Sequence, residues 1–382
     1  MSKAYLILAD GTVFEGQSIG AEGKSIGEVV FTTGMTGYVE TLTDPSYYGQ
    51  IVTQTFPLIG NYGVETPDFE SKKSWVRGYI VRELCEKPSN FRCEGDLSSF
   101  LKAQGIVGIC GIDTRRLTKI LREAGVMNGV IVSGEKNTSV IGKNKEPLLS
   151  EIRAYKIEDA VKSVQAGEVS PSLQPALQSS ATPSAGTGSP AKHVVLFDFG
   201  AKANIQRELE KRGCKVTVVP YDTTAEKVIA LSPDGIMLSN GPGDPAENVG
   251  VIAEISKLCA HGKIPIFGIC LGHQMLALAR GAKTTKLKYG HRGGNHPCKD
   301  LETGRVYITS QNHGYAVQTD SLPPCAKLRF ENANDNTCEG ITYTDIPAFS
   351  VQFHPEACGG PHDTNFLFDR FGEMMEACNA VK

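Results

Sequence analysis

A cysteine framed by two glycines stands where a strand is expected to give way to a helix. Residues 268–274 read G-I-C-L-G-H-Q, with the apolar residues 264–267 before them and the helix formers 275–280 after them. This order matches a nucleophile elbow, a sharp turn that holds a reactive side chain above a sheet. The helix start beyond Cys270 favours a thiolate and a developing oxyanion. A buried, inert structural cysteine is the alternative.

A cysteine nucleophile needs a base, and the base needs an orienting group. Residues 349–354 alternate between apolar and polar types, which predicts a strand that ends at His354 with the imidazole on the polar face. Glu356 follows across Pro355 and could hold the second imidazole nitrogen. A surface strand end with a solvated histidine and glutamate is the alternative for this stretch.

Four other histidines compete for a role. His273 falls in the first turn of the helix after Cys270 and is predicted to be structural, with helix capping or contact with a substrate as the alternative. His313 is expected in a turn, and its role is open. His291 and His296 flank two glycines in an expected loop. A metal site built from these is poorly spaced and no acidic cluster joins them, so no metal site is predicted.

A glycine-rich loop precedes the elbow. Residues 240–245 read N-G-P-G-D-P and follow an expected strand, as phosphate loops do, but they lack the lysine of G-x-x-x-x-G-K-[ST] and do not match G-x-G-x-x-G. The glycines permit close approach of a ligand to the backbone. An oxyanion-hole loop beside Cys270 therefore fits better than a nucleotide site, with a plain turn as the alternative.

The elements around these motifs predict a parallel α/β sheet, because strands and helices alternate after residue 193. The expected strands are 193–198, 216–219, 235–239 and 264–267, and the expected helices are 203–212, 223–231, 251–261 and 275–280. Ligands bind at the carboxyl ends of such strands, where the 240–245 loop and Cys270 both lie. Later strands, at 306–309, 340–344 and 348–354, are expected to be antiparallel.

The first part of the chain is predicted to be β-rich. A D-G turn joins two strands between residues 5 and 14, and further strands are expected at 29–31, 50–56 and 75–84, with turns at 34–38 and 43–49. A helix capped by Asp113 or Thr114 should run to Gly125, because its apolar residues share one face. Residues 145–166 are expected to form one more helix.

Composition divides the chain into two domains joined by a linker. Residues 170–192 are rich in Ser, Pro, Ala and Gly and carry no aromatic residue, which predicts an exposed linker. The predicted organisation is a β-rich mixed domain over 1–150, a helix and linker over 151–192, and an α/β domain over 193–382. In that last domain a central, mostly parallel sheet should be flanked by helices.

Charge and cysteine content limit the partners. The net charge of −3 favours neither nucleic acid nor a membrane surface as a partner, and no apolar run approaches the about 20 residues that span a bilayer. The first residues do not resemble a signal peptide. The 11 cysteines are odd in number and scattered without C-x-x-C pairs, which argues for a reducing cytoplasm.

Three motifs in order, at 240–245, 268–274 and 354–356, resemble the triad-type (class I) glutamine amidotransferase family. The first domain resembles that of the carbamoyl-phosphate synthase small-subunit family. The runs that carry this likeness are G-E-V-V-F (27–31), M-T-G-Y (35–38), L-T-D-P-S-Y (42–47), I-G-N-Y-G (59–63), G-I-D-T-R (111–115) and D-F-G-A-K (198–202). The likeness covers the chain except the linker.

The resemblance implies a glutamine-hydrolysing subunit. Cys270 would attack the side-chain amide to form a thioester, His354 would carry the proton, and Glu356 would orient His354. Backbone N–H groups of Gly241 and Leu271 would form the oxyanion hole. The glutamine-binding residues implied are Ser46, Gly241, Gly243, Leu271, Gln274, Asn312, Gly314 and Tyr315. Tyr315 replaces a phenylalanine common in relatives, and Ser46 would bring the first domain to the site.

The resemblance also implies a partner. Ammonia would pass through a tunnel to a separate large subunit, in a heterodimer or higher oligomer, that makes carbamoyl phosphate from bicarbonate and ATP. No cofactor is expected in this chain, with ATP and Mg²⁺ in the large subunit. Whether the product serves arginine or pyrimidine biosynthesis stays open. The alternatives are an amidotransferase subunit of another synthase, which would lack this first domain, a non-catalytic regulatory subunit, and a stand-alone cysteine hydrolase.

Overall fold

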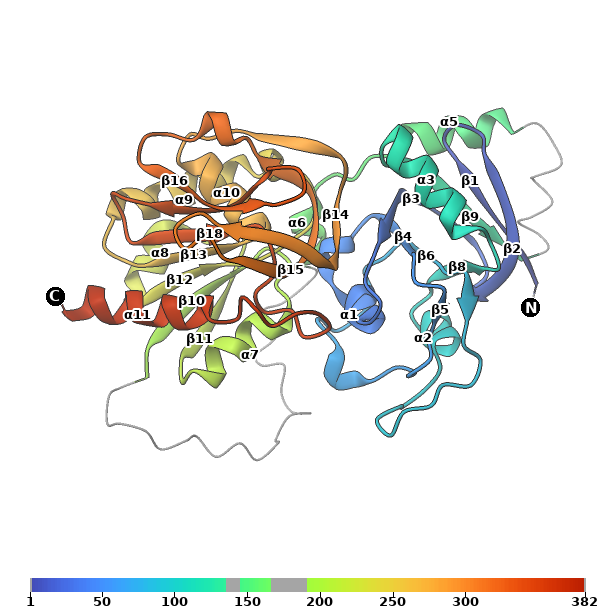
Figure 1. The fold of residues 1–382 in the computed structure, drawn as a ribbon, viewed down its shortest axis with the longest axis horizontal. Helices are drawn as coiled ribbons and strands as arrows, with labels where there is room; N and C mark the ends of the chain where they lie inside the picture. The colour runs from blue at the N-terminus through green and yellow to red at the C-terminus, as the bar shows by residue number, and fades with distance from the viewer. Residues whose placement is uncertain (1, 135–144, 166–190, 381–382) are drawn as a thin grey trace.

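The computed structural model describes residues 2–134, 145–165 and 191–380 (Figure 1). Two β-sheet units lie side by side, with the amino terminus on one and the carboxyl terminus on the other. Nearly all of the linker predicted over 170–192 lies outside the described residues. The domain boundaries therefore stay predictions, although the two sheets separate as expected.

The first unit is a closed barrel with the strand order β1-β2-β8-β6-β4-β3-β9. Its strands are β1 (Lys3–Leu8), β2 (Val13–Gly20), β3 (Lys24–Thr32), β4 (Gln50–Gln54), β6 (Gly78–Ile80), β8 (Val107–Cys110) and β9 (Met127–Ser133). The predicted hairpin is confirmed, because β1 and β2 pair antiparallel. A short separate pair, β5 (Leu58–Ile59) and β7 (Glu83–Leu84), lies within the same unit.

Helices pack against the barrel. The predicted helix α3 (Thr114–Ala124) is confirmed, and Asp113 caps it by accepting a hydrogen bond from the Arg116 N–H. Leu117 and Leu121 pack with the apolar side chains of β1, β4 and β8. The segment from 38 to 47, expected largely as turns, instead forms α1 (Tyr38–Thr43) and the 3₁₀ helix η1 (Pro45–Tyr47), and α2 (Leu97–Ala103) follows later.

The second unit is a nine-stranded sheet with the order β11-β10-β12-β13-β18-β17-β16-β14-β15. The bounds are β10 (His193–Asp198), β11 (Lys215–Pro220), β12 (Gly235–Leu238), β13 (Ile266–Ile269), β14 (Thr284–Asp300), β15 (Val306–Val317), β16 (Ala326–Asn332), β17 (Cys338–Tyr343) and β18 (Ala348–Val351). The strands from β11 to β18 in this order are parallel, and the remaining pairs are antiparallel. The strand expected over 348–354 ends at Val351 and runs parallel to β13 on one side.

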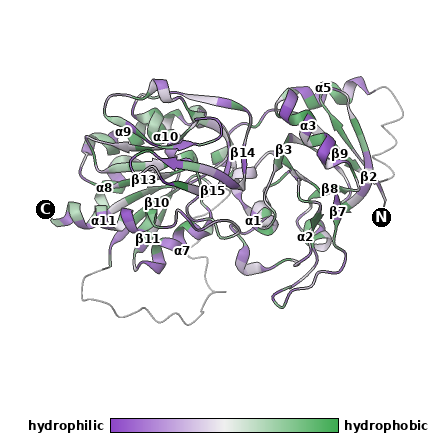
Figure 2. Ribbon diagram, viewed as in Figure 1, coloured by the Kyte–Doolittle hydropathy of each residue, from purple (hydrophilic) through white to green (hydrophobic). Residues whose placement is uncertain are grey.

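Helices cover both faces of this sheet. On one face α8 (Ala225–Ala230), α9 (Val249–His261) and α10 (Leu271–Ala279) contribute to one apolar cluster, and on the other α7 (Ala203–Lys211) and α11 (Leu367–Ala380) contribute to a second. The central strands β10, β12 and β13 are hydrophobic (Figure 2) and almost fully buried. None of the helices in the described residues has the length and apolarity that crossing a membrane requires.

A long two-stranded ribbon connects the two units. β14 and β15 pair over most of their length, and the ribbon reaches the barrel (Figure 1), where the Thr33 N–H donates to the Arg292 carbonyl over 3.1 Å. The sequence-based placement of three histidines is therefore wrong. His291 and His296 lie in β14 rather than in a loop, and His313 lies in β15 rather than in a turn, because backbone pairing continues through these glycine-rich segments.

The single helix expected over 145–166 is also wrong. The structure has α5 (Glu146–Ala154) and α6 (Ala160–Val164), and the chain between them is extended at Tyr155. The Tyr155 hydroxyl donates to the Gly49 carbonyl over 3.0 Å, and Asn128 donates to the carbonyls of Ile152 and Tyr155. These contacts with the barrel outweigh the helical periodicity. Helix α6 instead packs on the second unit through Val161.

Candidate active site

The turn at Cys270 is strained and depends on its two glycines. Cys270 sits between β13 and α10 with φ 52° and ψ −102°, a conformation that L-residues rarely adopt. A Cβ added at Gly272 would lie 2.3 Å from the Leu238 carbonyl oxygen, and one at Gly268 would lie 2.9 Å from the Gly272 carbonyl carbon. Only glycine allows the strand and helix to approach this closely. The predicted nucleophile elbow is thus present.

Backbone hydrogen bonds hold the turn in place and leave two donors free. The N–H of Cys270 donates to the Val351 carbonyl over 2.8 Å, and that of Gly272 donates to the Ser239 carbonyl over 3.0 Å. Among the described residues, the N–H groups of Gly241 and Leu271 have no acceptor. A Cβ at Gly241 would lie 2.7 Å from Leu271 Cδ2, so the two residues are neighbours. Their free N–H groups fit an oxyanion hole.

His354 and Glu356 form a buried pair just beyond β18. His354 Nδ1 donates to Glu356 Oε1 over 2.7 Å, and both residues are 1% exposed. The His354 N–H donates to the Ser310 carbonyl, which fixes the backbone of this segment on β15. His354 Nε2 makes no hydrogen bond of regular geometry, but it lies near Cys270. A solvated strand end, the alternative for this stretch, is therefore wrong.

The charges of this group favour an imidazolium. Burial lowers the pKa of His354, as does Lys202, but the Glu356 carboxylate and the contact with Cys270 outweigh both and raise it to about 9. Burial alone would raise the pKa of Glu356, yet the positive charges of His354 and Lys202 lower it to about 2. Glu356 is thus ionised at neutral pH, and His354 can carry the proton that the Cys270 thiol releases when it becomes the thiolate nucleophile.

Sequence reasoning missed the lysine behind this pair. Lys202 Nζ lies 3.4 Å from Glu356 Oε1 and 3.6 Å from Asp44 Oδ2, and the side chain is 9% exposed. Burial lowers the pKa of Lys202, but the negative charges of Asp44, Glu356 and Glu70 outweigh burial and raise the pKa above its usual value. The amine therefore stays charged. The available signal was its place in D-F-G-A-K, directly after the buried strand β10.

The implied glutamine-binding residues gather around one pocket of about 510 Å³ that Cys270 also lines. Those on its wall are Ser46, Gly241, Gly243, Gln274, Asn312, Gly314 and Tyr315. Leu271 is the exception, because its side chain packs in the hydrophobic core. A role for Leu271 would therefore have to use its backbone. Glutamine binding by the whole set stays a prediction.

Both units build this pocket. Asn240 Nδ2 donates to Ser46 Oγ over 2.9 Å, and Asn312 Nδ2 donates to Asp44 Oδ2 over 3.1 Å. Asp44 also caps η1 by accepting from the Ser46 N–H. The loop before β4 is therefore hydrogen-bonded to the nucleophile sheet at the site itself, as expected from the place of Ser46 in the first domain.

Two glutamine side chains of the protein, Gln274 and Gln352, form a chain of hydrogen bonds beside Cys270. Gln274 Nε2 donates to the Tyr315 carbonyl over 2.7 Å and to Gln352 Oε1 over 2.9 Å, and Gln352 Nε2 donates to Cys270 Sγ over 3.6 Å. Tyr315 thus contributes its backbone here. Its hydroxyl lies near Asp244, and burial and this carboxylate raise its pKa. The Tyr315 hydroxyl thus makes a polar contact beside the pocket.

His273 lies behind the site. Its side chain is fully buried and Nδ1 is 2.8 Å from Ser350 Oγ, and burial lowers its pKa to about 3. It does not line either of the two pockets beside Cys270 and His354. The prediction of a structural role agrees with this position.

Comparison with known families accounts for both units. Residues 6–131 match the family model described as "Carbamoyl-phosphate synthase small chain, CPSase domain", and residues 195–374 match "Glutamine amidotransferase class-I". The carbamoyl phosphate synthase small chain of Listeria monocytogenes is 52% identical over 98% of this chain and 97% of its own length. The chain belongs to the carbamoyl-phosphate synthase small-chain family. The small chain of Clostridium perfringens is also 52% identical, covering 97% of this chain and 98% of its own.

Family membership decides between the alternatives. The chain is a glutamine-hydrolysing subunit of carbamoyl-phosphate synthase, because the small-chain domain and the class I amidotransferase domain occur together. A subunit of another synthase would lack the first of these. Among solved structures, a putative GMP synthase protein from Thermoplasma acidophilum is similar to half of the small chain. Its TM-score is 0.44 at 23% identity, over 50% of this chain and 96% of the other.

Proposed function

We propose that Cys270, His354 and Glu356 release ammonia from glutamine and that a separate large chain, bound to this one, uses it with bicarbonate and ATP to make carbamoyl phosphate. The observation that carries the proposal is the meeting of a strained cysteine, which lines the first pocket, with a buried His–Glu pair and two free N–H groups. Each covers one requirement of amide hydrolysis: a nucleophile, a proton carrier and an oxyanion site.

The first half-reaction forms a thioester. The thiol proton moves from Cys270 to His354 Nε2, and the sulfur attacks the side-chain amide carbon of glutamine. The N–H groups of Gly241 and Leu271 hold the oxyanion of the tetrahedral intermediate. As the intermediate collapses, His354 returns the proton to the amide nitrogen and ammonia leaves. Glu356 keeps the imidazolium oriented throughout.

The second half-reaction regenerates the thiol. His354 takes a proton from water while the water oxygen attacks the thioester carbon, and the same N–H groups hold the new oxyanion. Collapse breaks the carbon–sulfur bond, the proton passes to the Cys270 sulfur, and glutamate leaves. These steps use only groups of this chain. ATP and Mg²⁺ are proposed to act in the large chain.

A second pocket suggests how ammonia leaves. It has a volume of about 400 Å³, and His354, Lys202 and Asn312 line it. Asn312 also lines the first pocket, so the two pockets share this wall residue. The outer wall is made by residues 32–37, 293–295 and 357–360. Ammonia released beside His354 could exit here without passing the glutamate, and we place the large-chain contact at this mouth.

The free cysteines support a reducing compartment as the location of the reaction. All 11 cysteines lie in the described part of the chain and all are free. A thiolate enzyme with this many unpaired cysteines suits a reducing compartment, which supports a cytoplasmic location. The carbamoyl phosphate made there would serve arginine or pyrimidine biosynthesis.

Reconstitution with a large chain tests the proposal. Wild-type protein, Cys270→Ser and the control Cys378→Ser are each mixed with a carbamoyl-phosphate synthase large chain, and carbamoyl phosphate is measured with glutamine or ammonium chloride. Cys270→Ser should fail with glutamine and succeed with ammonium, whereas the control should use both. Normal glutamine use by Cys270→Ser would refute the nucleophile, and failure of the large chain to bind would refute the partner.

A further inference from the structure

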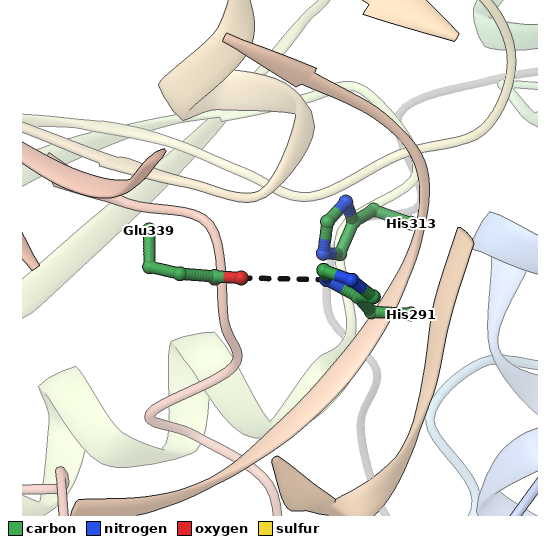
Figure 3. A group of neighbouring side chains, drawn as sticks. All are labelled: His291, His313 and Glu339. Carbon is green, nitrogen blue, oxygen red and sulfur yellow. Dashed lines mark ion pairs between the residues drawn. The ribbon is translucent and has the colours of Figure 1, made fainter. Parts of the chain in front are cut away.

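Three buried side chains from three strands converge beside the active site. His291 of β14, His313 of β15 and Glu339 of β17 each point a ligand atom into one small space, and these atoms all lie within 4.8 Å of one another (Figure 3). His291 and His313 are 7% and 5% exposed, and Glu339 is 0% exposed. The expectation that no acidic cluster joins these histidines missed Glu339, which reaches them from a distant strand.

Outer contacts orient both histidines toward this space. His291 Nε2 lies 2.8 Å from Asp335 Oδ2, and His313 Nδ1 donates to the Tyr315 carbonyl over 2.7 Å. In each ring the nitrogen that faces outward is held by a carboxylate or a carbonyl. In the neutral imidazoles, His291 Nδ1 and His313 Nε2 then carry lone pairs that face inward. Metal-binding histidines in proteins are held in this way.

The space holds more acceptors than donors. His291 Nδ1 and Glu339 Oε2 are buried and make no hydrogen bond, and His291 Nδ1 lies 3.4 Å from Glu339 Oε1, a contact that is an ion pair only when His291 is protonated (Figure 3). His313 Nε2 lies 2.9 Å from Gln311 Oε1. Because His313 Nδ1 donates to Tyr315, His313 Nε2 carries a lone pair. The contact with Gln311 then places this lone pair against the amide oxygen of Gln311. Buried acceptors without donors are costly unless a positive group lies among them.

We propose that His291 Nδ1, His313 Nε2 and Glu339 bind a divalent transition-metal cation, best matched by Zn²⁺, as a structural site. Two imidazoles and a carboxylate are ligands that Zn²⁺ accepts, and water or Gln311 Oε1 could complete the coordination. Ligands about 2.1 Å from a tetrahedral Zn²⁺ lie about 3.4 Å apart. His291 Nδ1 and Glu339 Oε1 already have this separation, and the remaining ligand atoms, which lie within 4.8 Å of one another, need to close by at most about 1.4 Å.

Such a cation would tie the ribbon to the sheet. His313 lies between Asn312 and Gly314, which line the pocket beside Cys270, and Glu339 belongs to β17 in the same sheet. β14 and β17 are not neighbours, because β16 lies between them. A metal bond across β16 would fix the part of the ribbon that forms the pocket wall. Asp335 is exposed, so solvent reaches the edge of the site.

Metal binding is measured on the full chain. After treatment with a chelator and its removal, Zn²⁺ is titrated calorimetrically in the presence of a phosphine reductant, with Mg²⁺ as the comparison ion. Glu339→Gln removes the charged ligand, and Glu331→Gln changes a carboxylate on the neighbouring strand β16. One equivalent of Zn²⁺ should bind the wild type and Glu331→Gln and raise the melting temperature. Glu339→Gln should bind at least tenfold more weakly.

Cobalt substitution separates this site from the thiols. Co²⁺ bound to nitrogen and oxygen should give weak visible bands without a sulfur-to-metal charge-transfer band in the wild type, and these should be lost in Glu339→Gln. A charge-transfer band would place the ion on a cysteine and overturn the proposal. So would equal Zn²⁺ affinity of wild type and Glu339→Gln. Absence of stoichiometric binding would identify the cluster instead as an ion pair of protonated His291 with Asp335 and Glu339.

Discussion

Lys202 Nζ lies 3.4 Å from Oε1 of Glu356, the same oxygen that accepts the hydrogen bond from His354. Lys202 also lies 3.6 Å from Asp44, which belongs to the barrel unit. The carboxylate of the catalytic pair is thus connected through one buried lysine to the other half of the molecule. The positive charge that this lysine supplies also opposes protonation of His354.

Replacing Lys202 by methionine should therefore change both stability and the pH profile. The variant leaves Asp44 and Glu356 buried without their cation, which should reduce the free energy of unfolding by about 3–5 kcal/mol. Removing the positive charge should raise the pKa of His354, so the alkaline limb of kcat/KM for glutamine should move to higher pH. Urea denaturation and rate measurements across pH test the two effects.

The control for Lys202 is Lys211→Met. Lys211 pairs with Glu208 of α7, and its side chain is 64% exposed. We expect little change in stability and none in the pH profile, because an exposed lysine contributes little and Arg212 still pairs with Glu208. An unshifted alkaline limb in Lys202→Met would show that Lys202 does not act on His354.

Gly272→Ala should disrupt the elbow. Its Cβ would lie 2.3 Å from the Leu238 carbonyl oxygen, so β12 and α10 must separate. The expected cost is about 1–3 kcal/mol of unfolding free energy, with a loss of kcat because Cys270 moves relative to His354. Gly250→Ala is the matched control, since nothing lies within 4 Å of a Cβ at this position in α9. It should stabilise by about 0.4–1 kcal/mol and leave kcat unchanged.

His273 should make the protein sensitive to acid. Its folded pKa of about 3 lies below the ordinary 6.5, so between these values the unfolded chain binds the proton and the folded one does not. Stability is therefore lost as the pH falls below 6.5. In His273→Asn the loss between pH 6.5 and pH 5 should shrink by about 2 kcal/mol. Urea titrations at both pH values measure it, and equal losses in both proteins would contradict it.

The control for His273 is His261→Asn. His261 is exposed at the end of α9, so its replacement should leave the acid dependence as it is in the wild type. Other buried histidines remain in His273→Asn, and part of the acid sensitivity should therefore persist.

The hydrogen bond between Asn312 and Asp44 should couple the two units. Because it joins an amide to a carboxylate, a double-mutant cycle with Asp44→Ala and Asn312→Ala should give a coupling energy of about 1–2 kcal/mol in unfolding. A cycle between Asp44 and Asn365, which bonds to Glu208 and Arg212 instead, should be additive. A coupling near zero for the first pair would show that this bond does not hold the units together.

Local signals predicted the parts of the fold that local chemistry determines. Asp113 caps α3, the glycines flank Cys270 in the expected turn, and the alternating strands and helices form the expected parallel pairs. The same local signals failed at residues 155–159, where contacts of Tyr155 with the barrel end the helix. The periodic spacing of apolar residues cannot predict such contacts between residues far apart in the sequence.

The site could be predicted only where its residues lie in recognisable motifs. Cys270, His354 and Glu356 stand in short patterns of characteristic spacing, so their chemistry was readable. Lys202 joins them through space, and Glu339 meets His291 through strand order. Neither of these two contacts corresponds to a recognisable spacing in the sequence, because both depend on which strands become neighbours in the fold.

The place of β18 has a consequence for synthesis of the chain on the ribosome. β13 lies between β12 and β18, and the N–H of Cys270 bonds to Val351 of that late strand. A nascent chain that stops before residue 351 contains the thiol but lacks both this bond and the imidazole of His354. Incomplete translation products therefore carry an ordinary cysteine, and glutamine consumption begins only after the strand that completes the sheet has been made.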